Sequence, residues 1–276
     1  LSAGYQKSIS LLRFNIAHRE QASYGGVYNI NESFSRLFYE SLRKNSQTFD
    51  AREFINKNIS FGGSTLPLRG DATPLEVKQL SKSSDSQYVI VGTITDISTL
   101  KPKVNGVAKL LDDDLPDRNF RINVQVFDGL NGSLLFDKSY SKVTKWEFAK
   151  HRSVDTNALK FWRSKFGNSL QLIIDDILFD LDANLQCKLV EGRVIAVSGN
   201  ELSINIGSNN GLKIGDSFLI KHSGGFVDQF GITRKKETNS RTKVEVTKVY
   251  EKQATLITTD LQPTANVQID DLVVLD

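Results

Sequence analysis

The sequence is poor in the residues that build disulfides and metal centres, and it lacks a long uninterrupted hydrophobic run. Its 276 residues include one cysteine, Cys187, three histidines and no methionine. No internal disulfide and no cysteine-based zinc site can therefore form within the chain. A membrane helix needs ~20 consecutive apolar residues, and the best candidate, residues 170–185, is interrupted by four aspartates. We expect a soluble chain that, because it begins with Leu1, is a processed form or a fragment.

Charge of either sign is not in large excess. The chain has 35 Lys and Arg residues against 32 Asp and Glu residues, which gives a net charge of +3. Neither nucleic acid nor an anionic membrane is therefore indicated as a partner. The length, with 39% hydrophobic and 24% charged residues, is typical of a globular protein with two domains.

The first predicted domain, residues 1–186, belongs to the α+β class. Runs rich in apolar and β-branched residues predict strands, and apolar residues spaced three or four apart predict helices. Along the chain we expect strand 8–16, helix 31–44, strand 54–59, helix 73–80 and strands 88–97, 120–127 and 133–140. The economical arrangement is a mixed sheet with two helices on one face, which is an α/β sandwich.

A long amphipathic helix over residues 157–185 is predicted to close this domain. Its apolar positions recur at three- and four-residue steps, which indicates one buried stripe. The stripe comprises Leu159, Trp162, Phe166, Leu170, Ile173, Ile174, Ile177 and Leu181. Arg163, Asp175 and Asp176 fall outside the stripe, so we expect them to form an exposed candidate partner surface. Trp146 precedes the helix and is the aromatic residue most free for another role.

Residues 187–276 predict a second, all-β domain. It contains six short runs in which apolar and polar residues alternate, separated by turns rich in glycine and asparagine. This pattern favours a small closed or nearly closed barrel. We expect positive φ angles at the turn residues Gly207, Gly211 and Gly215. Cys187 lies at the start of the first predicted strand, so we expect a buried, unreactive thiol.

The longest predicted loop of the barrel, residues 222–241, contains a basic and aromatic cluster. The cluster comprises Phe226, Phe230, Arg234, Lys235 and Lys236. Such a run is most often a solvated hairpin tip, and a protein or polyanion contact is the alternative. The histidines are scattered, and the aspartates at 112–114 lack the spacing of a cation site. Because glycine-rich phosphate loops and nucleophile elbows are also missing, we predict no catalytic residue, cofactor or metal.

Three strings resemble known proteins. YVIVGTITDI (88–97) and FDGLNGSLLFD (127–137) look like the amino-terminal α/β domain of TolB. EGRVIAVSGNELSINIGSNNGLKIGD (191–216) is similar to the carboxyl-terminal domain of the flagellar assembly protein T family. In this order, the two parts resemble the middle and carboxyl-terminal domains of that family. The family's amino-terminal domain has no counterpart that we identify in the sequence.

This resemblance implies a periplasmic, non-enzymatic component of the H ring around the basal body of sodium-driven polar flagella. Such a component supports the outer rings and holds the MotX/MotY ring that anchors the stator. The implied partners are other ring proteins and further copies of the chain. The resemblance implies no catalytic residue and no cofactor.

Two other functions remain open from the sequence. A TolB-like periplasmic module would recruit an envelope complex by strand addition or groove binding. A barrel of the OB type would bind nucleic acid or glycan. The balanced charge disfavours the second alternative, because binding to nucleic acid rests largely on Lys and Arg contacts to phosphates.

Overall fold

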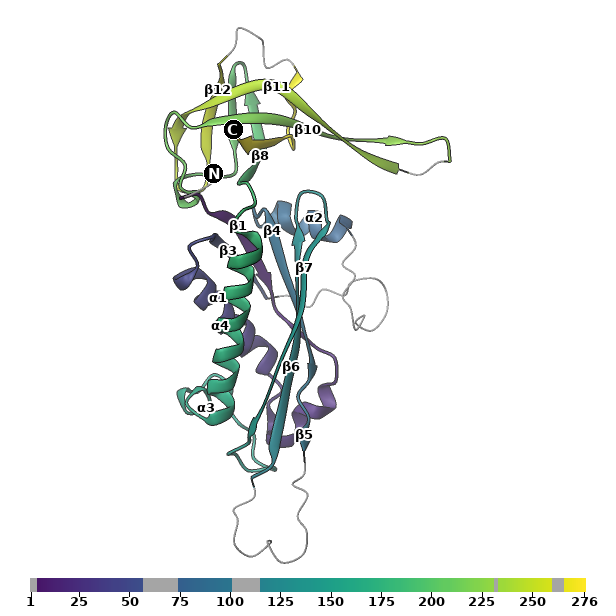
Figure 1. The fold of residues 1–276 in the computed structure, drawn as a ribbon, viewed down its shortest axis with the longest axis vertical. Helices are drawn as coiled ribbons and strands as arrows, with labels where there is room; N and C mark the ends of the chain where they lie inside the picture. Colours follow the sequence, from purple (N-terminus) through teal and green to yellow (C-terminus); the bar gives the residue numbers. More distant parts are fainter. Residues whose placement is uncertain (1–3, 57–73, 101–114, 231–232, 260–265) are drawn as a thin grey trace, which may run out of the picture. The chain divides into compact units, whose positions relative to one another are not determined.

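The chain forms two compact units. The computed structural model describes residues 4–56, 74–100, 115–230, 233–259 and 266–276. The sheet unit comprises Ile9–Ser46 and Ala51–Asn184, and the barrel unit comprises Leu1–Ser8, Gln47–Asp50 and Leu185–Asp276. Figure 1 shows the sheet with its helices and the strands of the barrel.

The sheet unit is built on a mixed sheet, as predicted. Its strands are β1 (Lys7–Leu12), β2 (Asn15–Ile16), β3 (Phe49–Ile55), β4 (Tyr88–Asp96), β5 (Thr99–Leu100), β6 (Asp117–Asp128) and β7 (Leu134–Lys145). They lie in the order β3-β1-β4-β6-β5, with β7 also paired to β6 and β2 to β4. β1 runs parallel to β4, whereas β6 is antiparallel to both β4 and β7.

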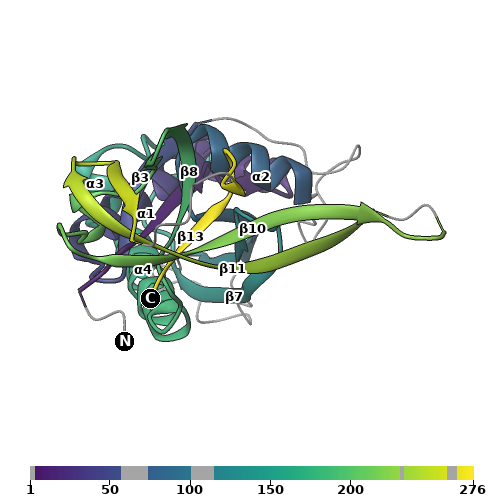
Figure 2. The same ribbon diagram turned by 90° about the horizontal axis from the view of Figure 1, so that it is seen from above.

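Helices cover both faces of this sheet (Figures 1 and 2). They are a 3-10 segment, η1 (Arg19–Gly26), and the α-helices α1 (Ile30–Asn45), α2 (Pro74–Ser83), α3 (Leu159–Trp162) and α4 (Lys165–Leu185). Phe34 of α1 and Phe166 of α4 pack on Phe120 of β6, with ring centroids 5.2 and 6.3 Å away. α1 and α4 therefore share one face. Val77 of α2 packs with Val89 of β4 on the other face.

The predicted helix 157–185 is divided, because Arg163 and Ser164 separate α3 from α4. The Ser164 Oγ accepts a hydrogen bond from the Gly167 amide (3.0 Å) and donates one to the Phe161 carbonyl (2.6 Å). These local bonds cap α4 and compete with a continuous helix. A Cβ at Gly167 would lie 2.1 Å from the Phe161 oxygen, so only glycine allows this close corner.

The apolar stripe is buried along α4 but not along α3. Its members on α4 are at most 1% exposed, namely Phe166, Leu170, Ile173, Ile174, Ile177 and Leu181. Leu159 of α3 is 62% exposed, and Trp162 is only half-buried. The prediction of one continuous stripe is wrong for these two residues, because the break at Arg163 and Ser164 takes α3 out of phase with α4.

Trp146 is fully buried, so the expectation that it is free for another role is wrong. Its ring lies 4.3 Å from the guanidinium carbon of Arg118, which is also fully buried. Arg118 donates hydrogen bonds to the carbonyl oxygens of Ile97 (3.2 Å), Tyr24 (2.8 Å) and Gln21 (3.3 Å). Burial lowers the pKa of Arg118 to about 10. This cation joins η1 and the end of β4 to the aromatic core.

The barrel unit contains a closed barrel with the strand order β10-β11-β12-β9-β8-β13, which confirms the predicted architecture. Its strands are β8 (Glu191–Ser198), β9 (Glu201–Ile204), β10 (Ser217–Val227), β11 (Thr233–Val249), β12 (Ala254–Thr258) and β13 (Leu272–Leu275), with a 3-10 turn, η3 (Ser208–Asn210). Val, Leu and Ile side chains and one aromatic ring, Phe218, fill the interior. The period-two alternation of the sequence places these residues inside.

Only two of the three turn glycines have a positive φ angle. Gly211 and Gly215 have φ angles of 85° and 92°, which L-residues adopt at a cost. Gly207 is extended, with φ at −151°. It is required for a different reason, since a Cβ there would lie 2.1 Å from the carbonyl oxygen of Tyr250.

Cys187 is exposed, which corrects the expectation of a buried thiol. Residues 186–189 connect α4 to β8 and are all exposed, and burial resumes at Val190. Leu189, the next apolar residue after Cys187, is itself 44% exposed. The strand begins at Glu191, four residues later than the sequence pattern indicates.

Candidate partner surface

The outward face of α4 carries apolar side chains beside its aspartates. Leu172 is 55% and Phe179 is 75% exposed. They lie seven residues apart, so they share one side of the helix. Asp175 and Asp176, predicted for this surface, are exposed between them. The sequence pattern did not identify these two apolar residues as part of the surface, although both fall outside the buried stripe.

The two exposed aspartates on this side of α4 differ in whether a cation lies nearby. The Asp176 carboxylate lies 3.6 Å from the Lys142 ammonium of β7. Within the described part of the chain, Asp175 has no ion pair. It is therefore the carboxylate that is best placed to meet a partner.

Asp180, one turn further along α4, has a structural role. It accepts hydrogen bonds from the Tyr140 hydroxyl (2.6 Å) and the Lys138 ammonium (2.5 Å) of β7. Burial raises the pKa of Asp180, but the bonds from Lys138 and Tyr140 outweigh burial and leave its pKa below the ordinary value. Burial and the Asp180 carboxylate both raise the pKa of Tyr140. These contacts fasten α4 to the outer strand of the sheet.

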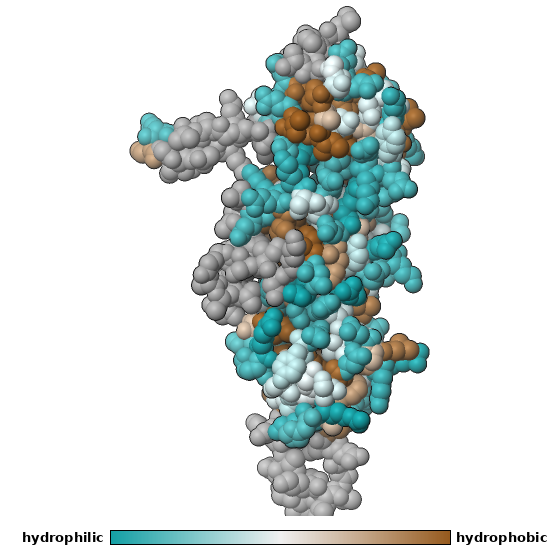
Figure 3. All heavy atoms as spheres, turned by 180° about the vertical axis from the view of Figure 1, so that it is seen from behind, coloured by the Kyte–Doolittle hydropathy of each residue, from teal (hydrophilic) through white to brown (hydrophobic). Residues whose placement is uncertain are grey.

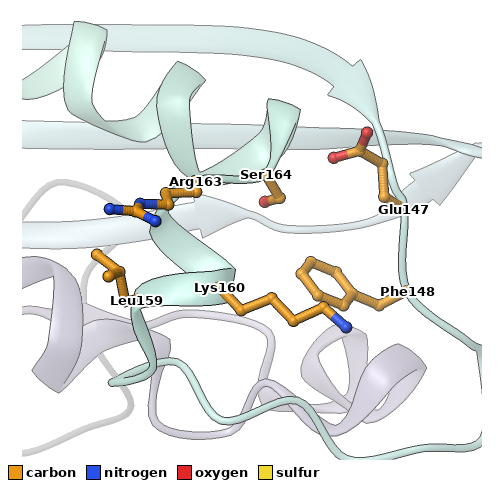
Figure 4. Close-up of a pocket in the computed structure, with 6 residues that line it drawn as sticks. All are labelled: Glu147, Phe148, Leu159, Lys160, Arg163 and Ser164. Carbon is orange, nitrogen blue, oxygen red and sulfur yellow. The ribbon is translucent and has the colours of Figure 1, made fainter.

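A pocket of about 470 Å³ opens at α3 (Figure 4). It is lined by Glu147, Phe148, Leu159, Lys160, Arg163 and Ser164. Phe148 and the exposed side of Leu159 provide apolar surface, and Lys160 extends beside Phe148. The Glu147 carboxylate is already engaged, because it accepts a hydrogen bond from the Lys165 amide (2.7 Å).

Two cationic side chains of the pocket are available to bind an anionic group. Among the residues that the structure describes, neither Lys160 nor Arg163 has a carboxylate within ion-pair distance. A neighbouring hollow of about 420 Å³ shares Phe148 and Lys160 and adds Arg152. The two hollows together are lined by three cations, Lys160, Arg163 and Arg152, and by the carboxylates of Glu147 and Asp155. The structure does not bring Arg163 together with Asp175, because twelve helical residues would span roughly 18 Å.

The second predicted cluster lies on a long hairpin, not on a loop. β10 and β11 continue beyond the other strands of the barrel (Figures 1 and 2). In the backbone register Phe226 is paired with Arg234, and Gly225 with Lys235. Phe230 is 76% exposed beyond the end of β10. The ladder of backbone hydrogen bonds therefore places the cluster, including Lys236, toward the far end of a two-stranded ribbon.

Other apolar side chains are exposed on the barrel unit. Ile195 and Val197 of β8 and Ile257 of β12 are between 37% and 39% exposed. Figure 3 shows apolar side chains gathered on one side of this unit.

Two of the three histidines each lie near a carboxylate. His18 lies 3.3 Å from Glu20, and the His222 Nδ1 lies 2.8 Å from Asp271. Within the described ranges no three His, Cys, Asp or Glu residues are grouped as metal ligands. The aspartates at 112–114 fall outside those ranges. Of the helices for which coordinates are described, none has the length and apolarity to cross a membrane.

Two family models match the chain in succession. The model of the flagellar assembly protein T middle domain matches residues 2–156, and that of its C-terminal domain matches residues 199–275. No curated protein matched the chain.

Several solved structures are also similar. A hypothetical protein from Chlamydia trachomatis is 16% identical over 66% of this chain and 98% of its own, with a TM-score of 0.47. A lipoprotein from Neisseria meningitidis is 11% identical over 64% and 99%, with a TM-score of 0.34. TolB from Acinetobacter baumannii is 11% identical over 94% and 48%, with a TM-score of 0.29. Similarity at this level carries no argument about function.

Proposed function

The chain belongs to the flagellar assembly protein T family, and we propose that it is a non-enzymatic structural component of the flagellar basal body. The observation that carries this proposal is the order of the matches, with both domains of the family side by side in one chain. Within the basal body we propose a place in the H ring, in the periplasm. There the protein would support the MotX/MotY ring and the anchoring of the stator.

The surfaces of the molecule support a role in assembly. Exposed aromatic side chains near charged groups are typical of protein interfaces. We propose two partner surfaces. The first comprises Asp175, Asp176, Leu172 and Phe179 on α4 with Arg163 in the pocket at α3. The second is the hairpin cluster Phe226, Phe230, Arg234, Lys235 and Lys236.

A deletion strain tests the proposed place in the flagellum. We expect the strain to lose motility and the outer ring of isolated basal bodies in electron micrographs, and to regain both with the wild-type gene. Sensitivity to detergent should not change. Detergent sensitivity with normal basal bodies would contradict the proposal and support a TolB-like envelope module instead.

Complementation with single variants tests the α4 surface. Phe179→Ala and Asp175→Lys should restore motility poorly, although exposed substitutions usually change stability by less than about 0.5 kcal/mol. Val143→Ala is the matched control, because Val143 is 59% exposed on β7 of the same unit. Normal motility from both α4 variants would contradict this surface. Phe230→Ala would then test the hairpin.

We also propose that the functional domains are residues 1–186 and 187–276, with the boundary between residues 184 and 191. Gln186 lies in this segment, and its carbonyl accepts a hydrogen bond from the Lys7 ammonium (2.7 Å). We therefore expect trypsin to cut slowly at Lys188 and to leave two stable fragments. Rapid cleavage within α4 would contradict the proposal.

A further inference from the structure

The end of the sheet unit that contains the pocket at α3 is basic, and the rest of α4 is acidic. Residues 146–165 include five Lys and Arg residues against two acidic residues. Residues 166–185 include four aspartates and no Lys or Arg. The near neutrality of the whole chain therefore conceals two adjoining segments of opposite charge.

The pocket at α3 selects for a particular kind of side chain. Phe148 and Leu159 are the apolar residues of its lining and would contact an apolar or aromatic group. Lys160 and Arg163 at its edge would meet a carboxylate close to that group. The pocket thus suits an exposed aromatic side chain that has an acidic residue about one helical turn away.

The outward face of α4 carries that combination. Phe179 is 75% exposed, and Asp175 precedes it by four residues, so both project from one side of the helix. Asp175 has no ion pair with the described residues. Leu172 extends the apolar surface by two turns toward the start of α4 and is 55% exposed.

Phe179 cannot enter the pocket of its own chain. It lies fourteen residues after Lys165 on one continuous helix, which is roughly 21 Å at 1.5 Å per residue. The pocket lies before the start of the same helix. The complementary surfaces can therefore meet only between two molecules.

We propose that Phe179 and Asp175 of one copy bind the pocket formed by Phe148, Leu159, Lys160 and Arg163 of a second copy. This inference rests on the proposed role in a ring and names the contact between copies. Two different patches meet, so repetition of the contact gives a ring or a filament unless two antiparallel α4 helices exchange it reciprocally. A contact that centres on one aromatic side chain is small, so association should be weak in dilute solution.

Disulfide trapping between two variants tests this contact and detects weak association. Both chains carry Cys187→Ser, because the native thiol is exposed. One chain carries Ala149→Cys beside the pocket, and the other carries Ala183→Cys one turn after Phe179. Both alanines are exposed. Neither change removes a residue of the proposed contact, which consists of Phe179, Asp175 and the pocket. The chains carry different tags, so the mixed disulfide is distinguished from the two homodisulfides on a gel.

We expect the mixed disulfide to form several-fold faster than a control in which Val143→Cys replaces Ala149→Cys. Val143 is 59% exposed on β7 and lies outside the pocket. Phe179→Ala should slow the mixed disulfide to the control rate. If the mixed disulfide forms no faster than the control although Phe179 and Asp175 are unchanged, the proposal is overturned.

Charge reversal separates a specific contact from a collision between exposed thiols. Arg163→Asp on the pocket chain should slow the mixed disulfide, and Asp175→Arg on the other chain should restore its rate. Failure of this rescue while Arg163→Asp alone slows trapping would show that Arg163 acts without Asp175, which would overturn the pairing. A deletion strain that lacks its ring although trapping fails would leave the proposed function intact and refute only this contact.

Discussion

The sheet unit and the barrel unit hold their cores together with different chemistry. The fully buried side chains of the described barrel core are aliphatic except for Phe218, and the partly buried ring of Tyr5 packs against them. In the sheet unit, Phe166 lies within 6.3 Å of three other aromatic rings, and its ring is 5.7 Å from the buried cation of Arg118. Aliphatic side chains pack by shape, whereas a buried cation and paired rings need particular directions. The sheet unit should therefore be more sensitive to single substitutions at its centre.

Phe166→Ala should have the largest effect. Removing a buried Phe costs about 3–5 kcal/mol of the free energy of unfolding, and Phe166 contacts Phe120, Trp146 and Phe161. Both tryptophans, Trp146 and Trp162, belong to the sheet unit. Tryptophan fluorescence during urea denaturation therefore reports on this unit alone.

Phe218→Ala is the matched control in the barrel, where Phe218 is also fully buried. This variant should leave the urea midpoint measured by tryptophan fluorescence unchanged. It should lower the urea midpoint of barrel unfolding measured by circular dichroism. If Phe218→Ala lowers the fluorescence midpoint as much as Phe166→Ala, the units unfold together. The stability of each core could then not be measured separately.

Arg118→Lys should have the next largest effect, with a loss of about 1–3 kcal/mol in the free energy of unfolding. A lysine keeps the charge, but its three N–H groups are on one nitrogen, which cannot reach the carbonyls of Gln21, Tyr24 and Ile97 together. It also has no planar group to stack on Trp146. Urea denaturation followed by tryptophan fluorescence measures the loss. Arg121→Lys, at an exposed position on the same strand, is the control and should change little. Equal stability of both variants would refute the proposed role of the buried guanidinium.

The difference between the cores also explains which parts of the fold could be predicted. The alternation of Val, Leu and Ile reveals the barrel because each buried side chain is two residues from the next. The stripe of α4 is visible for the same reason at helical spacing. Trp146 and Arg118 have no periodic signal, since their contacts join segments that are far apart in the chain. Sequence reasoning therefore left Trp146 outside the core.

The candidate site was predicted only in part, for similar reasons. Asp175 and Asp176 could be placed on the exposed face of a helix because they interrupt an apolar period. The pocket requires the corner at Ser164, which depends on a local cap and on the contact of Gly167 with a backbone carbonyl. One signal was available in the sequence. Phe179 lies two residues away from both Ile177 and Leu181 of the stripe and so must face outward.

Asp180→Asn should have a smaller effect that depends on pH. Its pKa is lowered in the folded state, so Asp180 stabilises the fold above its unfolded pKa of about 3.9 and loses this contribution as the pH falls through the folded pKa. Contacts of this kind at a surface contribute about 0.2–1 kcal/mol. The difference in unfolding free energy from wild type should be measurable at neutral pH and should shrink below about pH 4. Asp175→Asn, which has no ion pair to lose among the described residues, should show no such difference at either pH.

Cys187→Ser should change the free energy of unfolding least, because the segment that contains Cys187 is exposed and belongs to neither core. Exposed substitutions usually change the free energy of unfolding by less than about 0.5 kcal/mol. A thiol reagent should label Cys187 in the native protein at a rate close to that of the urea-unfolded chain, since the residue is already exposed. Strong protection in the native protein would mean that residues 186–189 pack against one of the units. The exposed connection after α4 would then belong to one of the two cores.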